Sequence, residues 1–113
     1  AGARPALKAI VGAYLSAAHR DRPERGCALA ALGADVARES PAARRALAAQ
    51  IEDLLALLAE HVPDRRGVSR RRQAMAVLAC LVGTLVLSRI VDDRAASEEI
   101  LAAARHHLTT PAG

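Results

Sequence analysis

The chain has 113 residues, a length that suits one domain around a single hydrophobic core. It is 52 % hydrophobic and 25 % charged, but Tyr14 is its only aromatic residue, so its core must consist of small aliphatic side chains. The net charge of +4 does not indicate a nucleic-acid surface, because the excess Arg lies between Arg65 and Arg72 without interleaved aromatics, as in a solvated loop. We expect one domain over residues 1–113, and a partner surface that adds burial to a thin core.

The abundance of Ala and the scattered β-branched residues predict an all-α fold with five helices. The first helix is predicted from Pro5 to Ala18, with one apolar side that consists of Leu7, Ile10, Val11, Tyr14 and Leu15. The stretch from His19 to Gly26 is predicted to be a loop, because its charges, Pro and Gly leave no apolar face to bury. A short second helix is predicted from Cys27 to Arg38.

Ser40 and Pro41 form a start signal for the third helix, since Ser caps a free backbone amide and Pro lacks one. This helix is predicted to extend to about Val62. Its apolar stripe consists of Leu47, Ile51, Leu54, Leu55, Leu58 and Val62. The segment from Pro63 to Val68 then closes it, so this helix should bury one face and expose the other.

The fourth helix, predicted from Ser69 to Val91, has no charge between Gln73 and Arg89 and is apolar all round. A membrane span is disfavoured, because this run is shorter than the roughly 20 residues that a bilayer requires. One face is bulky, with Leu78, Leu81, Val82 and Leu85, and another is small, with Ala76, Ala79 and Gly83. Gly83 indicates either close approach of another helix or contact with a large core side chain, and the sequence favours neither.

The fifth helix is predicted from Ser97, as N-cap, to about Leu108, with an apolar stripe of Ile100, Leu101, Ala104 and Leu108. The short link Asp92–Arg94 makes it an antiparallel neighbour of the fourth helix. Two such hairpins from two subunits would close a four-helix bundle. That bundle would bury the small face of the fourth helix.

No catalytic, cofactor or metal site is predicted, so we do not expect an enzyme. The four histidines lack metal-ligand spacing, and the glycines are too separated for a phosphate-binding loop. Cys27 and Cys80 lie far apart among apolar residues, which predicts buried free thiols in a reducing compartment. No signal peptide is apparent, and the chain does not begin with Met, which suggests that an upstream segment is missing.

Three stretches of this sequence resemble one branch of the TetR family of transcriptional regulators, in their C-terminal domain. They are Tyr14–Ser16 with His19–Asp21, Gly26–Gly33, and Leu81–Arg89 with the Asp92–Asp93 and Ser97–Leu101 segments that follow it. Ala28 stands where related sequences often have Pro, a change that is compatible with a helix start. The resemblance covers almost the whole chain.

The resemblance implies a bacterial, cytoplasmic repressor that dimerises, binds a small molecule, and reads DNA only through an N-terminal helix-turn-helix domain absent from this chain. Its implied dimer interface lies on the last two helices and comprises Ala76, Ala79, Gly83, Ile90, Ile100, Leu101, Ala104 and Leu108. Its implied effector pocket lies between the first three helices and comprises Tyr14, Leu32, Ile51, Leu55, Leu58 and Met75. Tyr14 is the strongest single candidate, because its phenol offers a polar group among aliphatic side chains.

Two other interpretations remain open at this point. Each predicted pocket residue is at least as well explained as ordinary core filling. The domain as a whole is also compatible with a helical interaction and dimerisation module that binds a protein partner and no small molecule. A small enzyme is the least supported, for lack of an acid, base or nucleophile in a recognisable setting.

Overall fold

The computed structural model describes residues 5–21, 38 and 40–110, and this part of the chain is helical without β-strands. Four helices have ten or more residues: α1 (Pro5–Tyr14), α4 (Pro41–Ala59), α5 (Arg70–Ile90) and α6 (Arg94–Thr109). A five-residue helix, α2 (Ala17–Asp21), follows α1. The predicted all-α class is confirmed, whereas the predicted helix at Cys27–Arg38 lies outside the described residues apart from Arg38.

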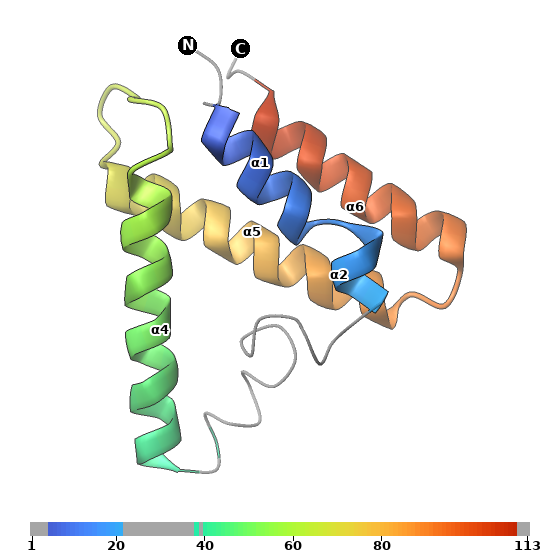
Figure 1. Ribbon diagram of the computed structural model, residues 1–113, viewed down its shortest axis with the longest axis horizontal. Coiled ribbons are helices and arrows are strands. Elements are labelled where there is room, and N and C mark those ends of the chain that lie inside the picture. Colours follow the sequence, from blue (N-terminus) through green and yellow to red (C-terminus); the bar gives the residue numbers. More distant parts are fainter. Residues whose placement is uncertain (1–4, 22–37, 39, 111–113) are drawn as a thin grey trace.

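Helix α5 lies at the centre of the arrangement (Figure 1). It contacts α4 near its own N-terminal end, and α6 returns beside it after a short link, as predicted for an antiparallel pair. Helix α1 packs against α6 and α5, and α2 reaches the C-terminal part of α5. Helix α5 therefore contacts each of the other described helices.

The core consists of aliphatic side chains that α1, α4, α5 and α6 direct toward one another. Its fully buried members are Leu7, Val11, Leu15, Leu55, Leu58, Val62, Ala74, Leu78, Leu81 and Leu101, and Tyr14, Ile51, Leu54 and Val82 pack against them. The bulky face predicted for the fourth helix thus faces the interior. At about 25 cal/mol per Å² of apolar surface, burial of these side chains is the main stabilising contribution to the fold.

The start signal predicted at Ser40 and Pro41 is confirmed, and α5 begins at the boundary predicted for the fourth helix. The Ser40 hydroxyl accepts a hydrogen bond from the Ala43 amide, with Pro41 as the first residue of α4. The Ser69 hydroxyl accepts from the Arg72 amide at the start of α5. The turn between α4 and α5 includes Gly67 at a φ of 77°, a backbone conformation that favours glycine.

The first helix is shorter than predicted, and part of the predicted loop is helical. Helix α1 ends at Tyr14, and the Ser16 hydroxyl donates to the Ala13 carbonyl, a local hydrogen bond of the kind that competes with helix continuation. The chain then forms α2, and Arg20 within it is buried, with 6 % of its surface exposed. The prediction of a loop was wrong here, because it assumed that a charged stretch has nothing to bury.

The last helix begins earlier than predicted. Asp93 is the N-cap of α6, and its carboxylate accepts a hydrogen bond from the Ala95 amide, so Ser97 is not the cap. Ser97 lies inside the first turn and is buried, because its side chain serves a tertiary contact described below. At its other end α6 extends to Thr109, close to the predicted boundary.

Helix α5 is the one described helix that has the length and composition to cross a membrane, with a mean hydropathy of 1.8 over its most apolar window. This is weak evidence, since core helices of soluble proteins have the same character. Here α5 contacts α1, α2, α4 and α6, which accounts for much of its apolar composition.

Candidate functional site

The side of α5 opposite the core carries a continuous row of apolar residues. This outer stripe recurs at helical spacing and consists of Met75, Ala76, Ala79, Gly83, Leu87 and Ile90. Its large side chains are 43 % exposed at Met75, 54 % at Leu87 and 72 % at Ile90. Large apolar side chains that are exposed along one helix face often form an interaction surface that a partner covers.

Gly83 lies in the middle of the outer stripe, and no described atom would contact a Cβ added there within 4 Å. The alternative that a large core side chain requires this glycine is therefore wrong for the described part of the chain. Glycine within a helix costs about 1 kcal/mol relative to alanine. Within the part of the chain that the structure describes, no neighbour of Gly83 therefore explains that cost.

The predicted interface residues of α6 are less exposed than those of α5. Leu101 is only 1 % exposed and belongs to the core of its own chain, so it offers little surface to the predicted interface. Ala104 and Leu108 pack partly against the same core, and Ile100 is half-buried. The structure therefore places the accessible apolar surface mainly on α5.

The predicted effector-binding residues divide into two groups. Leu55 and Leu58 are buried in the core, and Tyr14 and Ile51 are partly buried and pack against it. Met75 is instead exposed on the outer stripe, apart from these four residues. The sixth predicted residue, Leu32, lies outside the described residues.

A polar cluster around the buried residues Arg20, Ser88 and Ser97 joins α2 to the end of the α5–α6 hairpin where the two helices are linked, and the sequence did not predict it. The Arg20 guanidinium donates to the Ser97 hydroxyl at 2.9 Å, and Ser97 donates to the Ser88 carbonyl at 2.6 Å. Arg20 also donates to the Asp21 carboxylate at 2.9 Å, while the Arg89 side chain donates to the Arg20 carbonyl at 3.2 Å. We call these five residues the Arg20 junction.

The electrostatics of the Arg20 junction favour its charged form. The hydrogen bond from Arg20 lowers the pKa of Asp21 despite some desolvation, and the charge of nearby Arg94, 3.5 Å from the carboxylate, lowers it further. The same hydrogen bond raises the pKa of Arg20. A hollow of about 300 Å³ opens beside these groups, lined by the junction together with Val91, Asp92 and Arg94.

One sequence signal for the junction was present. Ser97 precedes Leu101, Ala104 and Leu108 on the apolar stripe of α6 at helical spacing, so it is a polar residue on a face that is otherwise buried. A buried hydroxyl requires a hydrogen-bond partner. The identity of that partner was beyond the sequence, because Arg20 is 77 positions away.

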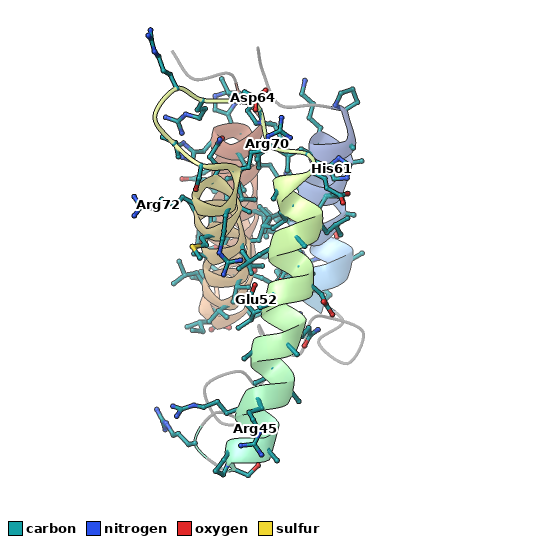
Figure 2. All side chains as sticks on the ribbon, turned by 90° about the vertical axis from the view of Figure 1, so that its left-hand side faces the viewer. Arg45, Glu52, His61, Asp64, Arg70 and Arg72 are labelled. Atoms are coloured by element: carbon teal, nitrogen blue, oxygen red, sulfur yellow. The ribbon has the colours of Figure 1, made fainter. Side chains whose placement is uncertain are left out.

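The Arg-rich turn at the other end of α5 is exposed, as predicted for a solvated loop. Arg70 donates to Asp64 at 2.7 Å, and Arg71 forms two hydrogen bonds to Glu52 of α4, whose pKa they lower. Figure 2 shows Asp64 and Arg70 together at this turn, Glu52 midway along α4, and Arg72 directed away from the helices.

The groups capable of metal or thiol chemistry are dispersed. The described residues contain no group of three His, Cys, Asp or Glu side chains that fits a metal ion. Cys80 is half-buried, with its sulfur 3.8 Å from the Thr84 hydroxyl. His106 and His107 are exposed on α6, while Cys27 and the side chain of His19 lie outside the described residues.

Comparison with known families gives one match. The model of the tetracyclin repressor-like C-terminal domain matches residues 3–104, which include all of α1, α2, α4 and α5 and most of α6. No curated protein and no solved structure matches the chain. The extent of the family match identifies this chain as a member of the tetracyclin repressor-like C-terminal domain family, and so as part of a TetR-family transcription regulator.

Proposed function

We propose that this chain is the effector-binding and dimerisation domain of a TetR-family transcriptional repressor. In this proposal two copies associate through their α5–α6 pairs, a small molecule binds within the helical core, and DNA is bound only by an N-terminal helix-turn-helix domain outside these 113 residues. The domain performs no catalysis and requires no cofactor. The intact protein acts in the bacterial cytoplasm.

The outer stripe of α5 is the observation that carries the dimer. It exposes Met75, Leu87 and Ile90, while Ala76, Ala79 and Gly83 let a second backbone approach closely. A second copy would present the same stripe, and self-complementary surfaces of this kind are typical of two-fold dimers. The thin aliphatic core adds a reason for association, since covering the stripe adds apolar burial.

The test of the dimer is sedimentation equilibrium at micromolar concentration, with Gly83→Leu as the decisive variant. We expect a dimer for the unchanged chain and a dissociation constant raised at least about tenfold by the substitution, since overpacking a close contact costs about 1–3 kcal/mol. Gly12→Leu is the matched control, because Gly12 is also a helical glycine with open space around its missing Cβ, on α1. A monomeric chain, or a dimer that tolerates Gly83→Leu, would contradict the proposal.

The effector site is proposed around Tyr14, Ile51, Leu55 and Leu58, which all belong to the core or pack against it. A ligand that binds there in one arrangement of α1 and α4 better than in another would shift the population of the dimer between them. Only this difference in affinity drives the control of DNA binding. The Tyr14 hydroxyl, buried among aliphatic side chains, would supply the polar contact.

A thermal-shift screen against apolar metabolites tests the effector site, because a ligand selective for the folded state raises the unfolding temperature. Hits should lose their effect in Tyr14→Phe if the phenol contacts them, and in Leu55→Met if the pocket lies at the core. A broad library without any hit would favour the alternative function, a helical dimerisation module that binds a protein partner and no small molecule.

A further inference from the structure

The last turn of α5 has two apolar residues on one face and two polar residues on another. Leu87 and Ile90 face outward and are the most exposed large apolar side chains of the outer stripe. Ser88 and Arg89, between them, face the Arg20 junction and bond to Ser97 and to the Arg20 carbonyl. One helical turn is therefore shared between a buried polar cluster and the proposed dimer surface.

Helix α2 depends on the junction for its position. With five residues it is too short to be stable in isolation, so tertiary contacts must hold it. Arg20 provides several of these contacts at once, to Ser97 of α6 and through its carbonyl to Arg89 of α5. Because hydrogen bonds are directional, they fix α2 in one orientation, whereas apolar contacts alone would tolerate small displacements.

Helix α2 is also adjacent to the proposed effector site. Tyr14 is the last residue of α1, and only Leu15 and Ser16 separate it from α2. The Arg105 side chain donates to the Leu15 carbonyl at this break, which ties it to α6 as well. A displacement of Tyr14 by a ligand would therefore act on α2 within one short turn of chain.

We infer that Arg20 is a positioning residue that couples the Tyr14 side of the domain to the dimer surface. It holds α2 against the hairpin, and thereby fixes the last turn of α5 with Leu87 and Ile90 in the orientation that a second copy meets. This inference rests on the proposed function for its two ends, the effector site and the dimer. The inference predicts that loss of the Arg20 junction weakens dimer association, although no residue of the junction belongs to the outer stripe.

The test compares the dimer dissociation constant of Arg20→Met with that of the unchanged chain. Met retains much of the length and volume of Arg but cannot form the side-chain hydrogen bonds to Ser97 and Asp21. The backbone carbonyl of residue 20 is unchanged. We expect the dissociation constant to rise at least about fivefold, the lower end of typical coupling between sites. Hydrogen exchange should also accelerate at residues 86–92, next to the outer stripe, since the Ser97 hydroxyl that bonds to the Ser88 carbonyl is no longer held by Arg20.

Two controls separate coupling from a loss of stability. Arg71→Met makes the same substitution at an exposed ion pair remote from the junction, and Val62→Ala weakens the core near the α4–α5 turn. Both should leave the dissociation constant within about twofold of the original. If Arg20→Met fails to fold, Ser97→Ala decides, since it removes only the hydroxyl that links Arg20 to Ser88.

The outcomes distinguish this inference from the function on which it rests. An unchanged chain that stays monomeric overturns the proposed dimer itself. If Ser97→Ala and Arg20→Met both form dimers with the dissociation constant of the unchanged chain, the coupling alone is overturned. A rise in both variants, with both controls unaffected, supports the coupling.

Discussion

The two ends of α5 use arginine and carboxylate side chains in opposite settings. At the start of the helix, Arg70 and Arg71 pair with Asp64 and Glu52 on an exposed surface, and each side chain of these pairs is at least 42 % exposed. At its end, the buried Arg20 guanidinium bonds to Ser97, which is also buried, and to Asp21, whose side chain is 47 % exposed. An arginine–carboxylate pair therefore contributes differently to stability at the two ends. Its contribution depends on burial and on shared hydrogen-bond partners more than on the presence of opposite charges.

Arg20→Met should have the largest effect on this comparison. The substitution removes the hydrogen bonds that the charged and buried Arg20 side chain donates to Ser97 and Asp21. We therefore expect the free energy of unfolding to fall by about 2 kcal/mol. Chemical denaturation followed by circular dichroism measures it. An unchanged denaturation midpoint would mean that Arg20 lies in solvent and that the two ends of α5 are alike.

Ser97→Ala should have the next largest effect. It leaves one Arg20 donor and the Ser88 carbonyl without their buried partner, and we expect a loss of about 1 kcal/mol in the same measurement. The double variant with Arg20→Met should cost less than the sum of the two single changes, because they remove a shared interaction. Strict additivity would show that the two residues act independently.

The acid dependence of stability distinguishes the ends further. The pKa of Asp21 is lowered in the folded state, so its contribution is present above its ordinary pKa of about 3.9 and is lost as the pH falls through the lower folded value. We expect Asp21→Asn to be less stable than the unchanged chain at pH 6, and the difference to vanish at the acid end. Thermal unfolding between pH 6 and pH 2 checks this, and a difference that grows toward low pH would contradict it.

Arg71→Met should have the smallest effect. Its partner Glu52 also has a lowered pKa, but both side chains are more than half exposed, so water screens the pair. The unfolding temperature should change by less than about 3 °C. A drop as large as that of Arg20→Met would show that exposed pairs on this helix matter as much as the buried cluster.

Sequence reasoning predicted most of the fold, for identifiable physical reasons. Ser40 and Ser69 cap helices through amides only three residues away, so local sequence is sufficient to place them. The aliphatic stripes of α4 and α5 repeat at helical spacing and face the core, although Leu47 at the start of the α4 stripe is only half-buried and lies outside it. The errors at α2 and at the start of α6 have one cause, since both depend on the Arg20–Ser97 contact between distant parts of the chain.

The candidate site was predictable only in part. Composition and spacing distinguished the small face of α5 from its bulky face, and the small face is the outer one in the structure. The exposure of Met75 and the burial of Leu101 were not foreseen, because periodicity assigns residues to a face but does not determine which neighbour covers that face. Only packed coordinates supply that neighbour.

The presence of a single aromatic residue makes Tyr14 a natural optical reporter. All intrinsic fluorescence and near-ultraviolet dichroism of this chain arise from one phenol, at the end of α1 and with its hydroxyl buried. Its emission can therefore be followed without labelling or engineered tryptophan. Quenching during a titration would localise the event to one position of the molecule, a resolution that chains with several chromophores do not give.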